Sequence, residues 1–139
     1  MGQQIYINLP VENLETSKAF YTELGYSFNP LYTNELAACM VVSDDIYVML
    51  LTKPFFATFT KKHIVDAQNS AQVLLCLTKD SREDVDKLVD KAMAAGAKIE
   101  RPTNAHDFMY ERSFNDPDGH IWEIMWMDDD AYKKMIGKS

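Results

Sequence analysis

One glutamate near the C-terminal end stands among apolar residues in a pattern that suits acid–base or metal chemistry. If its segment is a β-strand, alternation places Glu123 between Ile121 and Met125 on the same face. A carboxylate in such surroundings needs a cation, a hydrogen bond or a metal ion. Glu123 is therefore the candidate catalytic residue, as a ligand or general base. The alternative is an ion pair with Arg112 or Arg101 that only fixes the sheet.

A second candidate group precedes it in the chain. On a strand, Phe108, Tyr110 and Arg112 share one face, which offers two aromatic rings and one guanidinium. This combination suits an anionic or aromatic ligand, and we add the nearby Trp122 to the same predicted pocket. The alternative is ordinary cross-strand packing with a surface arginine.

The remaining reactive residue types carry weaker signals. No two of His63, His106 and His120 have the spacing of metal ligands. Cys39 and Cys76 lie inside apolar runs, so both are predicted to be buried, reduced and unreactive. The sequence contains no glycine-rich phosphate loop and no nucleophile elbow, which argues against nucleotide and serine hydrolysis.

Composition limits the classes of protein further. The 139 residues are 47% apolar and 25% charged, the proportions of an ordinary globular domain. The net charge of −7 disfavours nucleic-acid binding. No apolar run approaches the roughly 20 residues of a membrane span, and no signal peptide is recognisable. We expect a cytoplasmic protein with no nucleic-acid or membrane partner.

The elements that must position these residues follow the same order twice. The first half predicts a strand over 5–11, a helix over 14–24 ending at Gly25, and strands near 28, 36–42 and 46–51. The second half repeats this order, with a strand over 71–77, a helix over 82–95 and strands over 97–100, 108–114 and 120–127. The chain thus predicts an α+β domain built from module 1–53, link 54–70 and module 71–139. Each helix covers one face of its sheet, and the uncovered faces predict an enclosed cavity.

An aromatic cluster lies in the predicted link. Phe55, Phe56 and Phe59 follow Pro54 in a segment that connects the two halves. Aromatic side chains on a connection need cover from the cavity or from a second chain. We therefore expect a homodimer.

Three stretches together resemble the vicinal oxygen chelate superfamily, which includes the glyoxalase and bleomycin-resistance-like proteins. They are residues 8–26 with Phe20-Tyr21 and Leu24-Gly25, residues 85–97, and the segment Asp116-Pro-Asp-Gly-His-Ile-Trp-Glu123. More narrowly, residues 38–41 and 112–126 are similar to a bacterial subgroup whose members are labelled predicted lactoylglutathione lyase. The resemblance covers nearly the whole chain and implies two βαβββ modules whose curled sheets enclose a cavity.

The resemblance also implies where a metal would be held. Enzymes of this superfamily bind a divalent ion through His, Gln or Glu on four strands. The corresponding positions here are Tyr6 (with Asn8 two residues on), Met49, Leu74 (or Gln72 if the register slips by two) and Glu123. Only Glu123 is a good ligand for a hard divalent ion.

These observations lead to one expected function and two alternatives. We expect a small-molecule-binding protein with a degraded metal site, no cofactor and little or no catalytic activity. One alternative is a lyase of the lactoylglutathione lyase type that uses Zn, Ni, Mn or Mg, held by Glu123 and Gln72, on a thiol adduct of an α-oxoaldehyde. The other is an isomerase or epimerase with Glu123 as base. The predicted ligand-binding residues are Tyr6, Asn8, Met49, Gln72, Leu74, Tyr110, Arg112 and Trp122.

Overall fold

The computed structural model describes residues 2–137 and divides the chain into two compact units. The first unit is Met1–Ala67 and the second is Gln68–Ser139. The boundary falls inside the predicted link 54–70.

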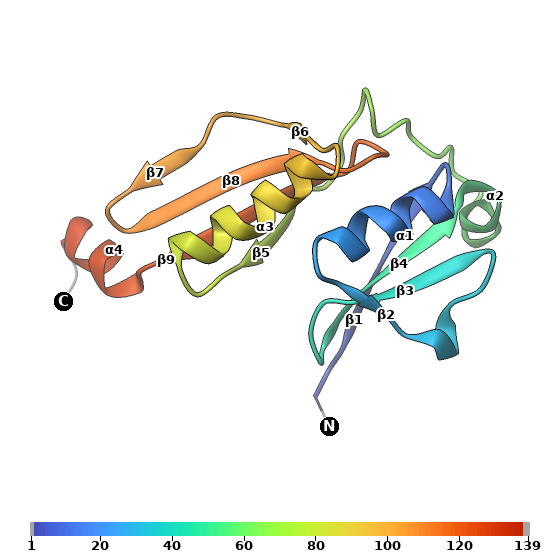
Figure 1. The fold of residues 1–139 in the computed structure, drawn as a ribbon, viewed down its shortest axis with the longest axis horizontal. Coiled ribbons are helices and arrows are strands. Elements are labelled where there is room, and N and C mark those ends of the chain that lie inside the picture. Colours follow the sequence, from blue (N-terminus) through green and yellow to red (C-terminus); the bar gives the residue numbers. More distant parts are fainter. Residues whose placement is uncertain (1, 138–139) are drawn as a thin grey trace. The chain divides into compact units, whose positions relative to one another are not determined.

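The first unit is a four-stranded sheet with one long helix on one face (Figure 1). Its elements are β1 (Ile5–Val11), α1 (Leu14–Glu23), β2 (Ser27–Phe28), η1 (Pro30–Tyr32), β3 (Ala37–Val41), β4 (Ile46–Thr52), α2 (Lys53–Phe56) and η2 (Ala57–Phe59). The strand order is β1-β4-β3-β2, with β1 parallel to β4 and the other pairs antiparallel.

The second unit repeats this plan with one additional short strand. Its elements are β5 (Leu75–Thr78), α3 (Arg82–Ala94), β6 (Lys98–Ile99), β7 (Asn104–His106), β8 (Met109–Asn115), β9 (Ile121–Met127) and α4 (Asp129–Met135). The order is β5-β9-β8-β6, and β7 also pairs with β8. The α+β architecture of two βαβββ modules is confirmed.

Local signals explain where the two long helices begin and end. The side chain of Asn13 accepts a hydrogen bond from the Thr16 amide, and Ser81 caps α3 through the Asp84 amide. Gly25 and Gly96 follow the helices with φ of 101°, a conformation that glycine adopts without strain. These boundaries match the sequence prediction.

Each helix buries an apolar stripe against its own sheet. In α1, the buried residues include Leu14, Phe20 and Tyr21. In α3, four residues at helical spacing are buried, namely Val85, Leu88, Val89 and Ala92. They pack with strands β8 and β9, whose fully or nearly fully buried side chains are Phe114, Trp122 and Ile124. Consequently one face of each strand is committed to the core and the alternate residues are left for the other face.

The structure differs from the predicted elements at several points. The strand predicted to start at residue 71 begins at Leu75, because the preceding residues 71–74 are exposed and unpaired with any described strand. Strand β7 and helix α4 were not predicted. The aromatic cluster is not a plain link, since it folds into α2 and η2 with the Phe55 and Phe59 rings 5.1 Å apart.

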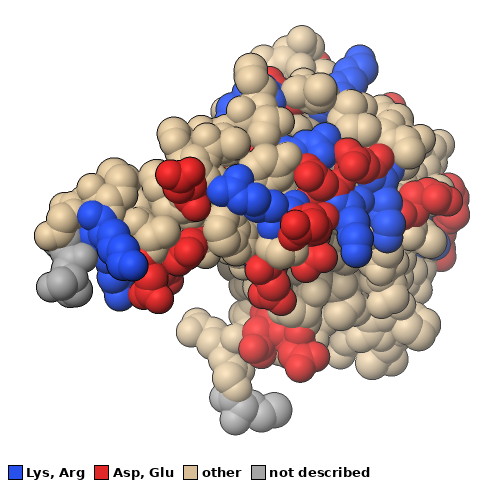
Figure 2. Space-filling view, turned by 60° about the vertical axis from the view of Figure 1, so that its left-hand side comes forward, with Lys and Arg blue, Asp and Glu red and all other residues tan. Residues whose placement is uncertain are grey.

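The surface mixes both signs of charge. Figure 2 shows Asp and Glu side chains interspersed with Lys and Arg side chains on the face that it presents. Among the described residues, no helix is long and apolar enough to cross a membrane.

Candidate functional site

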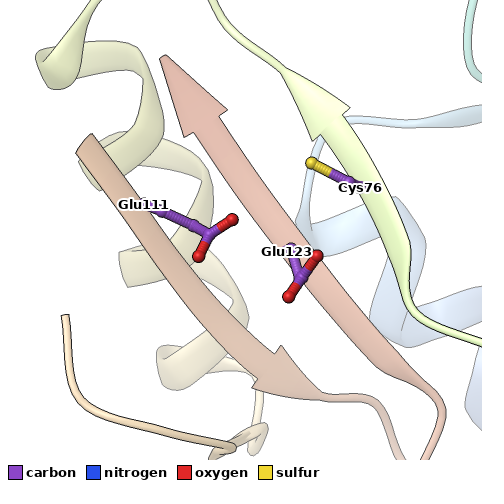
Figure 3. Close-up of side chains that lie close together, drawn as sticks. All are labelled: Cys76, Glu111 and Glu123. Carbon is purple, nitrogen blue, oxygen red and sulfur yellow. The ribbon is translucent and has the colours of Figure 1, made fainter. Parts of the chain in front are cut away.

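Two glutamates lie close together on the face of the second sheet opposite to α3. Strand β8 presents Glu111 and Ser113 on this face, and β9 presents Glu123. The antiparallel register places Ser113 directly opposite Glu123 and leaves Glu111 on the diagonal. Figure 3 shows the two carboxylates beside each other above neighbouring strands. We call this the open face of the second sheet.

A single guanidinium joins both carboxylates. Arg101, in the connection between β6 and β7, pairs through Nη2 with Glu111 Oε1 and lies 2.6 Å from Glu123 Oε2. The two carboxylate side chains are only 12% and 13% exposed, whereas Arg101 is 37% exposed. The bonds to both glutamates raise the pKa of the guanidinium, which is charged in any case. Of the two partners that the sequence offered for Glu123, the structure selects Arg101.

A thiol completes the cluster and corrects one prediction. Cys76 on β5 lies opposite Glu123 in the parallel register and is exposed, so its predicted burial is wrong, whereas Cys39 is buried as expected. The donor atoms of Cys76, Glu111 and Glu123 lie within 4.8 Å of one another. Partial burial and then the charges of Glu123 and Glu111 raise the pKa of the Cys76 thiol, and Arg101 opposes this shift.

One buried hydroxyl on the same face has no partner. Ser113 is 4% exposed, and its Oγ makes no hydrogen bond among the described residues. Leaving such a group unsatisfied costs about 1–3 kcal/mol. The open face therefore contains a polar group that no described residue satisfies.

Three residues of the predicted pocket lie on the other side of this sheet. Tyr110 and Arg112 both donate to Asp86 Oδ1 of α3, at 2.7 and 2.9 Å, and Arg112 also bonds Asp90 at 2.9 Å. Trp122 is 2% exposed beneath the same helix. Grouping these three residues with Glu123 was wrong, because odd- and even-numbered residues of a strand point to opposite faces.

Two further predicted residues lie outside the sheet. Gln72 and Leu74 precede β5 and are exposed. The position opposite Glu123 belongs to Cys76, two residues beyond Leu74. The count from the family motif pointed to Leu74 and not to Cys76. The apolar run had predicted a strand from residue 71, whereas β5 begins at Leu75.

The three predicted residues of the first unit do share one face. The parallel register pairs Tyr6 with Tyr47 and Asn8 with Met49, on the face opposite to α1. The Tyr6 and Tyr47 rings stack with centroids 4.7 Å apart. Desolvation and the neighbouring Tyr47 raise the pKa of the Tyr6 hydroxyl. Tyr6, Tyr47, Asn8 and Met49 thus supply phenol, amide and thioether groups. None of these four residues has a carboxylate or an imidazole, the usual ligands of a divalent metal.

The sequence contained a usable signal for the two missed residues of β8, Ser113 and Glu111, but not for Cys76. A tight turn over 115–119 fixes the antiparallel register, and counting outward from it places Glu111 on the face of Glu123. No comparable signal locates Cys76, since its parallel pairing depends on the long crossover through α3. Arg101 was one of the two predicted partners of Glu123, but it lies in an irregular connection with no periodicity, so the sequence could not favour it over Arg112.

Comparison with known proteins supplies a wider context. A family model described as "Glyoxalase/Bleomycin resistance protein/Dioxygenase superfamily" matches residues 3–124. The hypothetical protein SA1046 from S. aureus is 25% identical, with 91% of this chain and 94% of that chain covered and a TM-score of 0.76. A glyoxalase/bleomycin resistance protein/dioxygenase family enzyme from Burkholderia phytofirmans PsJN is 20% identical, with 91% and 99% covered and a TM-score of 0.74.

A third similar structure is that of a protein named for antibiotic resistance. The fosfomycin resistance protein FosX from Mesorhizobium loti is 13% identical, with 91% and 92% of the chains covered and a TM-score of 0.67. At this identity the likeness concerns the fold alone. No curated protein matches the sequence.

Proposed function

The chain belongs to the glyoxalase/bleomycin resistance protein/dioxygenase superfamily, and on this premise we propose that it binds a small molecule without a divalent metal and has little or no catalytic activity. The observation that carries the proposal is the pairing of Arg101 with both Glu111 and Glu123. A guanidinium already supplies positive charge at the carboxylate that the family resemblance assigns to a metal.

The donor groups do not fit a divalent ion beside Arg101. Three donors lie within 4.8 Å of one another, which by distance alone is enough for one ion. However, both carboxylates are engaged by the guanidinium, and partial burial with the two carboxylate charges raises the pKa of the Cys76 thiol, which disfavours the thiolate form that binds metals. The matching positions of the first unit, Tyr6 and Met49, offer no hard ligand. A metal would therefore have to displace Arg101.

A metal-dependent lyase remains the second candidate, because the same three donors can converge on one ion once Arg101 moves away. The two functions predict different metal contents. The protein is dialysed against Zn²⁺, Ni²⁺, Mn²⁺ or Mg²⁺, freed of unbound ions and analysed by mass spectrometry, with Glu83→Gln as an exposed control on α3.

We expect substoichiometric metal and negligible turnover of the methylglyoxal–glutathione adduct. One bound ion per chain, together with turnover that disappears in Glu123→Gln but persists in Glu83→Gln, would establish the lyase instead.

We also propose a homodimer. Phe59 in η2 is 68% exposed beside Phe55, so a large ring is left without cover within the described chain. Light scattering at micromolar concentration is expected to give twice the 15.9-kDa chain mass. A purely monomeric species would contradict the proposal.

A further inference from the structure

The open face of the second sheet has an unbalanced charge. Glu111 and Glu123 carry two negative charges and Arg101 carries one positive charge. These three side chains together therefore have a net charge of −1. The two carboxylates are largely buried, and an uncompensated charge in such a place is costly. One additional monovalent cation would neutralise the group, whereas a divalent ion would reverse its sign.

The free acceptors on this face match a particular kind of donor. Arg101 uses Glu111 Oε1 and Glu123 Oε2, which leaves the second oxygen of each carboxylate without a hydrogen bond among the described residues. Ser113 Oγ, buried and without a partner, lies on the same face directly opposite Glu123. These three oxygens are all acceptors, and a primary ammonium group has three N–H donors and no acceptor.

From charge and hydrogen-bonding capacity together we propose that this face binds the primary ammonium group of a small organic amine, held by Glu111, Glu123 and Ser113 beside Arg101. The inference rests on the proposed function and specifies its ligand class.

The test uses n-butylammonium chloride as the probe and 1-butanol as the neutral probe of the same length. The full chain is titrated while its amide resonances are followed by NMR. We expect saturable shifts centred on Cys76, Ser113 and Glu123 with the amine, at a dissociation constant in the millimolar range, and none with the alcohol. Equal response to both probes, or no saturable response to the amine, overturns the inference.

Three variants separate binding from a structural role. Glu111→Gln should weaken amine binding about tenfold, because one charge is lost, while Glu83→Gln leaves it unchanged. Arg101→Gln should strengthen it, since the competing internal cation is removed. Ser113→Ala should weaken binding without lowering the melting temperature, because the hydroxyl has no partner to lose. A Ser113→Ala variant that binds the amine as wild type does, or a weaker affinity in Arg101→Gln, contradicts the proposed geometry.

Failure of this inference can be told apart from failure of the proposed function. Binding of neutral or anionic molecules in the absence of metal would overturn the amine ligand but leave a metal-independent binding protein. Tight Zn²⁺ binding that is lost in Cys76→Ser would overturn both.

Discussion

The two faces of the second sheet use alternate residues of the same two strands, and their charged groups are arranged in opposite ways. On the helix-covered face, Tyr110 and Arg112 donate to carboxylates of α3, and Arg82 lies 5.4 Å from the Tyr110 ring and 4.9 Å from the Trp126 ring. These interactions join a helix to a sheet.

On the open face, the charged groups are held by a connection rather than a helix. Arg101 reaches both carboxylates from the segment between β6 and β7, and within residues 2–137 the Ser113 hydroxyl has no hydrogen-bond partner. The difference indicates that the helix-covered face is stabilised mainly by apolar packing, whereas the open face is held by charge pairing and keeps capacity for a ligand. Four predictions test this difference.

The largest effect is expected from neighbouring residues on opposite faces. Ile124 is fully buried under α3, so Ile124→Ala should lower the free energy of unfolding by about 2–5 kcal/mol. Met125 lies on the open face and is only half-buried, so Met125→Ala should lower it by about 1 kcal/mol or less. Urea denaturation of both variants measures this. Equal losses would mean that the open face is part of the core.

For the two arginines, the larger loss in the free energy of unfolding is expected on the open face. Arg101→Gln leaves two carboxylates that are 12% and 13% exposed without a cation, which should lower the free energy of unfolding at pH 7 by about 3 kcal/mol. Arg112→Met leaves carboxylates that are 45% and 69% exposed, so water replaces much of the interaction and the loss should be about 1 kcal/mol. Denaturant titration checks both, and a larger loss for Arg112→Met would contradict the comparison.

Acid should weaken the helix-covered face through Asp86. The hydrogen bond from Tyr110, with additional help from Arg112, holds the pKa of Asp86 below its usual value, although burial acts against this. A lowered folded-state pKa gives stability that is complete above the unfolded pKa near 4 and is lost as pH falls through the folded value. Tyr110→Phe should therefore make the loss of stability below about pH 4 shallower.

The matched control for that measurement is Tyr47→Phe, because the Tyr47 hydroxyl donates to a backbone carbonyl instead. Thermal unfolding between neutral and acidic pH measures both variants. An unchanged acid slope in Tyr110→Phe would show that the hydrogen bond does not govern the titration of Asp86.

The smallest effect concerns the thiol of the open face. N-ethylmaleimide should label one cysteine per native chain, because Cys76 is exposed and Cys39 is buried. Glu123→Gln should speed the reaction a few-fold, since removal of a negative charge lowers the pKa of the Cys76 thiol. Mass spectrometry of timed samples measures the rate. Labelling of Cys39 at the same rate would show that the first sheet is more open than the structure indicates.

The sequence by itself determined the local elements and their order. Asn13 and Ser81 cap the long helices, Gly25 and Gly96 end them, and apolar residues at helical spacing bury one side of each helix. Such signals act within a few residues, so they can be recognised without knowing the rest of the fold. Alternation along the last strand likewise places Glu123 and Trp122 on opposite faces. The predicted pocket nevertheless included Trp122.

Only the tertiary structure decided which residues surround Glu123. Cys76 lies opposite Glu123 because β5 pairs in parallel with β9, and the chain between these strands passes through α3. No periodic pattern in the sequence indicates the register of this pairing. Arg101 reaches the carboxylates from an irregular connection, where its position depends on how β6 and β7 pair with β8. Long-range pairing joins segments that carry no local signal for one another. The sequence could therefore offer Arg101 only as one of two candidates, and it could not locate Cys76.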